Sequence, residues 1–274
     1  MAEIIISNAP DSFKSYLKAA VKDKKDKLDR PEEARQAAIL FCSDGLADCD
    51  RMLDFLKQAK FAQSRPEIEK AAVERQLKEI SSGSCDAAGN LNVSIEAISS
   101  PALKQKLVEP LIYSLYPEKD PCVRRKSVQT LGKLARAQIK LERIIEALAA
   151  RLNDTDINVL FNIFSIFEDL SALKMSVKTK EKMVWPLIGA TSHDDKNIRV
   201  QAVRVLGEFA QSEVSISTKT KIVHALFSTL QDGEWVIRVA SAESLENYLK
   251  ANLPASLKAE IREEIRKHAP RKAK

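Results

Sequence analysis

Apolar residues recur every three or four positions along most of the chain, with polar residues between them. This spacing places the apolar side chains on one face of a helix, whereas a half-buried strand would alternate strictly. Helices are predicted over residues 11–28, 32–43, 46–61, 66–80, 101–116, 121–136, 140–152, 155–171, 177–191, 196–211, 217–231, 234–252 and 255–268. The segment "SSGSCDAAGNLN" at 81–92 is small and polar and is predicted to be a loop. Most connections are short, so consecutive helices are expected to be antiparallel neighbours.

One short pattern recurs in four of the predicted helices. Each copy has a reference residue, and these are Arg124, Asn158, Arg199 and Arg238. An apolar residue precedes each reference residue, and an acid lies four positions before it, at Asp120, Asp154, Asp195 and Glu234. The acid can cap the free N–H groups at the helix start, and the apolar positions form a buried stripe. A two-helix unit cannot bury its apolar face alone, so the repetition predicts stacked helix pairs.

Two of the preceding helices carry a proline at matching places, Pro110 and Pro186, which bends a helix. With the acidic turn and the second helix of the form "VR..A...LG", the pattern resembles the HEAT repeat. The resemblance is good at 107–136 and 183–211 and fair at 222–250. It is weak at 142–170, where Asn158 replaces the arginine. Residues 50–80 look like a degenerate further copy.

The HEAT resemblance implies an all-α solenoid of about six helix pairs with a C-terminal capping helix. We expect one superhelical domain over 1–274, with irregular helices and a loop at 1–92, the best repeats at 93–252, and a capping helix with a basic tail at 253–274. HEAT proteins are mostly scaffolds or carriers, and the resemblance implies the same for this chain. Some proteins of similar helical-repeat architecture are enzymes, but no residues here match their sites.

Composition and motifs exclude several classes of protein. Seven glycines and 5% aromatic residues are too few for a sandwich or barrel. Glycine-rich phosphate loops, HExxH and GxSxG are all missing from the sequence. The three histidines are isolated, and His224 is aligned with the proline of other repeats, which indicates a structural role. We therefore expect no catalytic residue, no cofactor, no metal and no small-molecule substrate.

The cysteines and the apolar runs bear on the compartment. The four cysteines form no CxxC, so neither a zinc site nor a disulfide framework is expected. The first thirteen residues lack the basic region of a signal peptide, and no apolar run approaches the roughly 18 residues that span a bilayer. We expect an intracellular protein of the cytoplasm, with the nucleus as the alternative and no membrane partner.

A surface for a protein partner is predicted on the second helices. Positions two, five and nine after the reference residue share one face. In the first, third and fourth copies they are mostly polar: Lys126, Gln129 and Lys133, then Gln201, Arg204 and Glu208, then Ala240, Glu243 and Asn247. In the second copy they are Leu160, Ile163 and Phe167. Either this helix is buried on every side after a change of register, or it offers an apolar groove flanked by Lys126, Lys133 and Arg204.

The two tryptophans are further candidates. Trp235 lies in the turn "QDGEWVIR" and either anchors a partner or packs over the next repeat. Trp185 precedes Pro186 inside a first helix and is expected in the core.

The net charge of +6 is concentrated near the two ends. Residues 14–30 and 258–274 each hold seven Lys or Arg against three acids. The first stretch has interleaved aspartates, as a solvated helix face has, whereas no acid follows Glu264. The candidate contacts for nucleic acid or an acidic protein are Arg262, Arg266, Lys267, Arg271 and Lys272. The sequence thus favours a non-enzymatic protein-binding scaffold, with a nucleic-acid-binding repeat protein as the alternative.

Overall fold

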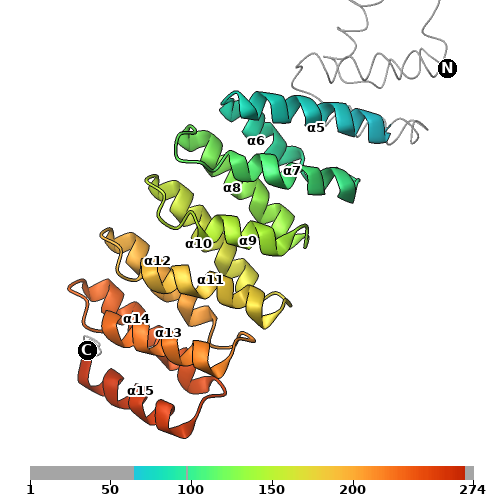
Figure 1. The fold of residues 1–274 in the computed structure, drawn as a ribbon. Coiled ribbons are helices and arrows are strands. Elements are labelled where there is room, and N and C mark those ends of the chain that lie inside the picture. Colours follow the sequence, from blue (N-terminus) through green and yellow to red (C-terminus); the bar gives the residue numbers. More distant parts are fainter. Residues whose placement is uncertain (1–64, 97, 269–274) are drawn as a thin grey trace, which may run out of the picture. The chain divides into compact units, whose positions relative to one another are not determined.

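The computed structural model describes residues 65–96 and 98–268 (Figure 1). Every regular element in these ranges is an α-helix. The chain forms two compact units, residues 1–114 and residues 115–274. The expected helices at 11–28, 32–43 and 46–61, and the basic stretch at 14–30, lie outside the described residues.

Unit 1 contributes three described helices, α5 (Arg65–Ser81), α6 (Cys85–Ser94) and α7 (Pro101–Tyr113). Helix α5 packs against both α6 and α7. Helix α6 covers residues 85–92 of the segment 81–92 that was predicted to be a loop, so that prediction is wrong. Ser84 caps α6 by accepting the N–H of Ala87, and Ala88 and Leu91 are buried. Burial of these side chains outweighs the low helix propensity of the flanking small residues.

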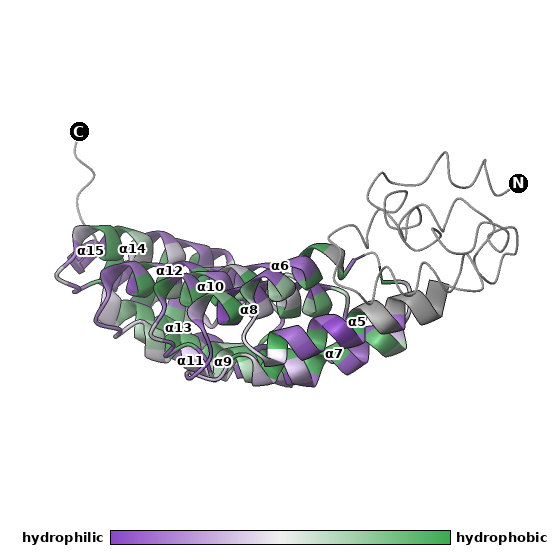
Figure 2. Cartoon of the chain, turned by 90° about the horizontal axis from the view of Figure 1, so that it is seen from above, coloured by the Kyte–Doolittle hydropathy of each residue, from purple (hydrophilic) through white to green (hydrophobic). Residues whose placement is uncertain are grey.

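Unit 2 is a stack of helices in two layers (Figure 2). The second helices form one layer: α8 (Pro121–Arg136), α10 (Ile157–Ser171), α12 (Lys196–Glu208) and α14 (Trp235–Lys250). The first helices form the other: α9 (Leu141–Ala149), α11 (Val177–Ala190), α13 (Ile216–Thr229) and α15 (Ala255–His268). Successive helices within each layer pack side by side, and α11 and α13 each pack on the second helix that follows. The all-α solenoid fold is therefore confirmed.

Capping residues set most of the helix starts. Asp120, Asp156 and Asp195 cap second helices, and Ser176 and Ser215 cap first helices, each by accepting a backbone N–H. Because these caps are visible in the sequence, the predicted helices of unit 2 agree with the observed ones within three residues at each end. Pro110 and Pro186 lie inside α7 and α11 as predicted.

The second helices approach each other closely at two glycines. A Cβ at Gly132 would lie 2.7 Å from the side chain of Ile166 on α10. A Cβ at Gly207 would lie 2.6 Å from Oγ and 3.3 Å from Cα of Ser244 on α14. Since a Cβ cannot approach a heavy atom that closely, a larger residue at either position would force the facing helix or its side chains to shift.

Cys85 and Cys122 each take part in a disulfide bond, which corrects the expectation that the cysteines form no disulfide framework. No helix in the described ranges is both long and apolar enough to cross a bilayer. The expectation of one superhelical domain over 1–274 stays a prediction.

Candidate partner-binding surface

The N-caps of the second helices fix the register of the repeat. These caps are Asp120, Asp156, Asp195 and Glu234. Four residues after each cap lie Arg124, Leu160, Arg199 and Arg238, which are 36, 39 and 39 residues apart. The predicted reference residue of the second copy, Asn158, is thus wrong by two positions, and Leu160 takes the place of the arginine.

Leu160, Ile163 and Phe167 are core residues, with 2%, 0% and 0% of their surface exposed. Helix α10 packs between α8 and α12, so both of its flanks are covered. The prediction that the three side chains form an exposed apolar groove is wrong. In the observed register Ile163 takes the position of Ser127, and Phe167 takes that of Leu131, which are buried positions of the repeat.

The polar surface of the second helices, called the ridge below, continues through α10 once the register is set. It consists of the side chains two, five and nine positions after the four reference residues. These are Lys126, Gln129, Lys133, Asn162, Ser165, Asp169, Gln201, Arg204, Glu208, Ala240, Glu243 and Asn247. All except Ala240 are polar and partly or fully exposed. Gln129 Nε2 donates to Asn162 Oδ1 at 3.1 Å, which links α8 to α10 along the ridge.

An apolar row lies next to the ridge, one position after the reference residues. It contains Phe161, Val200 and Val239, all partly exposed, with Arg125 at the same position of α8. At the start of α14 lie Trp235 and Val236, which are 56% and 49% exposed. The role of Trp235 as an anchor for a partner stays a prediction. The apolar row was not predicted, because it emerges only in the observed register.

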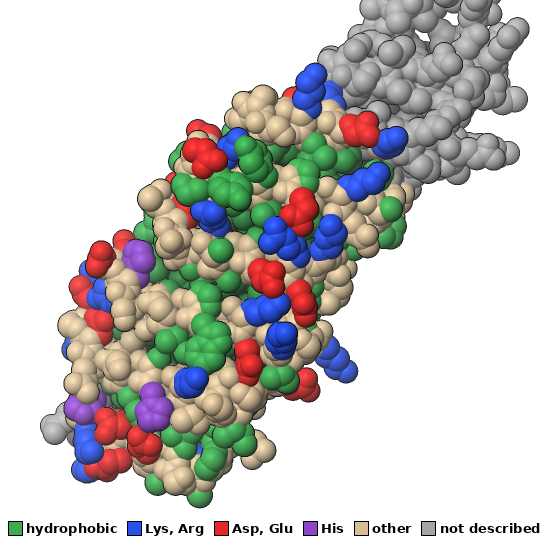
Figure 3. All heavy atoms as spheres, in the orientation of Figure 1, with side chains coloured by type: hydrophobic (Ala, Val, Ile, Leu, Met, Phe, Trp, Pro, Cys, Tyr) green, Lys and Arg blue, Asp and Glu red, His purple; other side chains and the backbone are tan. Residues whose placement is uncertain are grey.

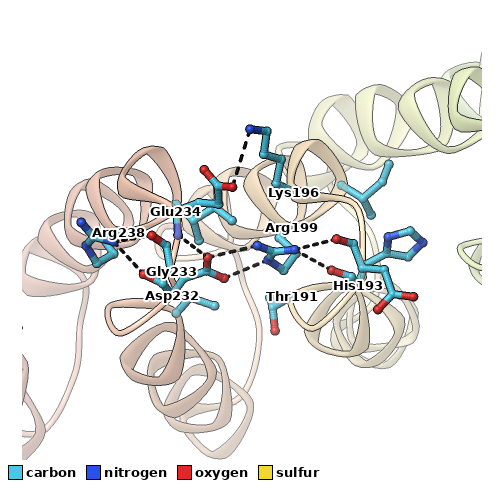
Figure 4. Close-up of polar contacts among 12 residues, drawn as sticks. Thr191, His193, Lys196, Arg199, Asp232, Gly233, Glu234 and Arg238 are labelled. Carbon is cyan, nitrogen blue, oxygen red and sulfur yellow. Dashed lines mark hydrogen bonds and ion pairs between the residues drawn. The ribbon is translucent and has the colours of Figure 1, made fainter.

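Two arginines at the reference position each hold an aspartate of the following turn. Arg124 donates from Nε and Nη2 to Asp154 at 2.9 and 2.8 Å, and both side chains are at least 97% buried. Arg199 makes the same pair of bonds to Asp232 at 2.8 and 3.1 Å (Figure 4). Such bidentate pairs fix both distance and orientation between neighbouring repeats. We call them the Arg–Asp ladder.

The ladder shifts the pKa values of its members. Burial opposes ionisation of Asp232, but hydrogen bonds from the Arg199 side chain and the Glu234 N–H outweigh it, so the pKa of Asp232 is lowered. The hydrogen bonds to Asp232 raise the pKa of Arg199. Both shifts favour the ionised form of the pair.

The ladder is interrupted at the contact between α10 and α12. Leu160 replaces the arginine, and His193 takes the position of Asp154 and Asp232 in the following turn. Nδ1 of His193 accepts the N–H of Asp195 at 3.0 Å, as Asp154 and Asp232 accept the N–H two residues on. The imidazole thus keeps the turn bond of the aspartate, while an apolar side chain replaces its ion-pair partner.

The first helices carry polar links of their own on the face shown in Figure 3, where charged side chains of both signs lie among hydrophobic ones. Thr179 donates to Glu142 at 2.7 Å and Thr218 donates to Glu181 at 2.6 Å. Chiefly because of these hydroxyl hydrogen bonds, the pKa of each glutamate is lowered.

Trp185, on α11, is 45% exposed, which contradicts the expectation that it is a core residue. The ammonium of Lys221 lies 4.6 Å from the centre of its ring, a cation–π contact. The 39-residue period also aligns Trp185 with His224, so the alignment of His224 with Pro186 is wrong by one position.

The cations predicted to contact nucleic acid are divided by the structure. On α15, Arg266 pairs with Glu263 at 2.8 Å and Lys267 with Glu264 at 3.3 Å. The hydrogen bond from Arg266 lowers the pKa of Glu263 to about 2. Arg262 is exposed, and Arg271 and Lys272 lie outside the described residues.

The structure groups no three His, Cys, Asp or Glu side chains as a metal ligand set in residues 65–96 and 98–268. The expected absence of metals, cofactors and catalytic residues stays a prediction.

Comparison with known proteins shows the fold. No protein-family model matches the sequence, and no curated protein matches it. An engineered protein of known structure superimposes with a TM-score of 0.53 and 17% identity, over 96% of this chain and 76% of that one. A computationally designed armadillo repeat protein for modular peptide recognition gives 0.47 and 17%, over 80% and 94%. A designed armadillo repeat protein in complex with a (KR)4 peptide gives 0.48 and 15%, over 85% and 98%. The first of these likenesses agrees with the all-α fold of the described residues.

Proposed function

We propose that this chain is a non-enzymatic scaffold that binds a protein partner along the ridge and the apolar row of its second helices. The observation that carries the proposal is the apolar row. Phe161, Val200 and Val239 are partly exposed on three neighbouring helices, where a polar residue would suit water better. Apolar contacts beside polar and amide side chains are typical of protein interfaces.

The charges of the ridge favour a protein over a nucleic acid. Its cations are Lys126, Lys133 and Arg204, and its anions are Asp169, Glu208 and Glu243. A phosphate backbone needs a surface of one sign, because its affinity comes from releasing counterions. Two cations of α15 are already paired with glutamates on the same helix. A mixed surface suits a protein with complementary charges.

The test is capture of partners from an extract of the source cells, with and without nuclease, followed by elution with rising salt. The ridge variant combines Arg204→Glu with Glu243→Arg, which exchanges two exposed charges and leaves the net charge unchanged. The matched control combines Lys178→Glu with Glu260→Lys, which exchanges two exposed charges of first helices.

We expect nuclease-resistant partners that the ridge variant loses and the control retains. Equal capture by both variants would contradict binding at the ridge. Loss of all partners with nuclease would support nucleic-acid binding instead, and charge reversal at Arg262 would then be the next variant.

We further propose the cytoplasm as the location, with the nucleus as the alternative. Its support is the sequence pattern alone, and the disulfide bonds of Cys85 and Cys122 weigh against it, since disulfides are rare in reducing compartments. Fractionation of source cells under thiol-blocking conditions tests it: recovery of the chain in a secretory compartment would overturn it.

A further inference from the structure

The last arginine of the ladder in unit 2 holds no aspartate. Arg238 Nη1 donates to the carbonyls of Asp232 and Gly233 at 2.7 and 2.9 Å, just as Arg199 Nη1 donates to two carbonyls of its own turn (Figure 4). In Arg124 and Arg199 the remaining Nε–Nη2 edge binds a carboxylate. In Arg238 this edge forms no ion pair with any described residue. The guanidinium is therefore held in place, while its carboxylate-binding edge pairs with no acid among the described residues.

The chain does not supply the missing carboxylate at the position that the repeat dictates. Helix α15 takes the place of a first helix, so the turn after it would carry the ladder aspartate. The residue 39 positions after Asp232 is Arg271, a cation. The position that the repeat dictates therefore provides no carboxylate to bind Arg238 as Asp232 binds Arg199.

Trp235 indicates what accompanies that carboxylate. In the preceding repeat the equivalent residue is Lys196, whose Nζ lies 3.6 Å from Glu234 Oε1 (Figure 4). Lys196 and Arg199 thus reach the same following turn, one to each of its acids. At the end of the stack these two positions are Trp235 and Arg238. The indole, which is 56% exposed, would favour an apolar group where the lysine favours a second acid.

Glu246 argues against a further helix packed as the second helices pack on each other. It takes the position of Gly207, where a Cβ would already collide with Ser244 of the next helix. The exposed glutamate side chain prevents an equally close approach by a helix beyond α14. The occupant therefore meets the beginning of α14 and not its whole length, which also disfavours a second copy that would continue the stack.

We infer that Trp235 and Arg238 form a docking point for an aspartate-containing, helix-initiating turn of a protein partner. The aspartate carboxylate binds the Nε–Nη2 edge of Arg238, and a neighbouring apolar side chain packs on the indole. This inference rests on the proposed function, because it states the chemistry of a partner. It places that contact at the end of the stack, separate from the ridge.

The probe is a blocked heptapeptide with the sequence of residues 153–159, Asn-Asp-Thr-Asp-Ile-Asn-Val, which contains the turn that Arg124 holds. It is titrated to millimolar concentration into the ¹⁵N-labelled full chain. The readouts are the indole N–H of Trp235, distinguished from that of Trp185 by a Trp185→Phe variant, and the Nε–H of Arg238. We expect both signals to shift together and saturate.

Replacing the first aspartate of the peptide by asparagine should weaken binding about tenfold or more, since a charge-assisted bidentate contact becomes a neutral one. Arg238→Lys keeps the positive charge but loses the two parallel N–H donors of the guanidinium. It should therefore weaken binding of the aspartate peptide by a similar factor. Arg143→Ala, which removes an exposed arginine of α9, is the control and should leave peptide binding unchanged. Circular dichroism of each variant checks that it folds.

Equal binding of the two peptides, or no shift at Trp235 and Arg238, overturns the docking point. Failure of the proposed function gives a different pattern. In that case the Arg204→Glu/Glu243→Arg variant still captures its partners, while the peptide titration is unaffected by the exchange.

Discussion

Leu160 and His193 together occupy the positions of one Arg–Asp pair of the ladder. Introducing an arginine and an aspartate there should therefore add the stabilising interaction of such a pair. In the Leu160→Arg variant the new guanidinium lies five and six residues after the carbonyls of Thr155 and Asp154, as Arg199 lies after those of Asp194 and His193. At the position that Asp154 and Asp232 occupy in other repeats it would find His193 and not a carboxylate. Because the site is 98% buried, we expect a loss of about 3 kcal/mol in unfolding free energy, typical of an unpaired buried charge.

The single variant His193→Asp should cost less than about 1 kcal/mol, because a carboxylate can accept the same N–H of Asp195 that Nδ1 accepts now. In the double variant the two new groups face each other as Arg199 faces Asp232. We expect a favourable coupling of about 2 kcal/mol, within the range measured for residues in one hydrogen-bonded network.

The assay is urea unfolding followed by circular dichroism, with the four free energies combined in a double-mutant cycle. Asn158→Arg combined with His193→Asp is the control, since Asn158 is exposed and two residues out of register. Its coupling should stay below about 0.5 kcal/mol. If Leu160→Arg alone does not fold, recovery of the fold by His193→Asp is the expected result. A larger coupling for the Asn158 pair than for the Leu160 pair would refute the observed register.

Three further predictions follow from individual contacts. Gly207→Ala should destabilise the chain by about 1–3 kcal/mol, because the new Cβ meets Ser244. Gly189→Ala, where no atom lies near the new Cβ, should stabilise α11 by about 0.5–1 kcal/mol. Thermal unfolding compares the two variants, and an equal effect would contradict the close approach of the helices at Gly207. Ser241→Ala should lower the free energy of unfolding by about 1 kcal/mol, because its Oγ bonds both Thr229 and Ile237. Ser127→Ala, at the same repeat position, should be neutral or stabilising, because no partner of its buried Oγ is found in the described residues. A larger loss of stability for Ser127→Ala than for Ser241→Ala in urea unfolding would contradict this expectation. In the folded chain the pKa of Asp232 is below its ordinary value, so its contribution to stability is complete above the unfolded pKa and is lost as pH falls through the folded pKa. Asp232→Asn should therefore flatten the acid side of the curve of unfolding free energy against pH. An unchanged slope would contradict the pKa shift.

Helix positions could be predicted from the sequence because their signals are local. Ser176 and Ser215 each precede an apolar run by a few residues, and both cap a helix as that spacing indicates. Helix α6 could not be predicted in this way. Its own sequence is weakly helical, and it forms because Ala88 and Leu91 are buried in unit 1. Burial of this kind depends on residues distant in sequence.

The register of α10 could not be settled locally, because two acids compete for one role. Asp154 and Asp156 lie two residues apart, and either can cap a helix start. In the structure Asp156 caps α10, while Asp154 accepts the Arg124 fork and the N–H of Asp156. The deciding interaction spans 30 residues of sequence. The same two-residue shift accounts for the wrong assignment of Leu160, Ile163 and Phe167 to the surface.

Trp185 was assigned to the core because an aromatic residue before a helix proline suggests burial. Its helix position decides otherwise, since the equivalent residue of α9 is Glu146, which pairs with Lys182 at 2.6 Å. Lys221, the equivalent of Lys182, reaches Trp185 in the same way. A surface site of the repeat therefore keeps its lysine and exchanges an ion pair for a cation–π contact.

Departures from the repeat are more informative than the repeat itself, because the regular positions are explained by stacking alone. Where Leu160 and His193 stand in place of a ladder pair, both members of the pair differ, Leu160 is buried and His193 keeps the bond to the N–H of Asp195. At Trp235 and Arg238 the arginine remains, its Nη1 bonds remain, and only the acid is missing. A partly buried arginine that merely ended the stack would need no fixed fork, and a neutral residue would avoid the cost of desolvating it. The retained geometry is what distinguishes a docking point from a simple end cap.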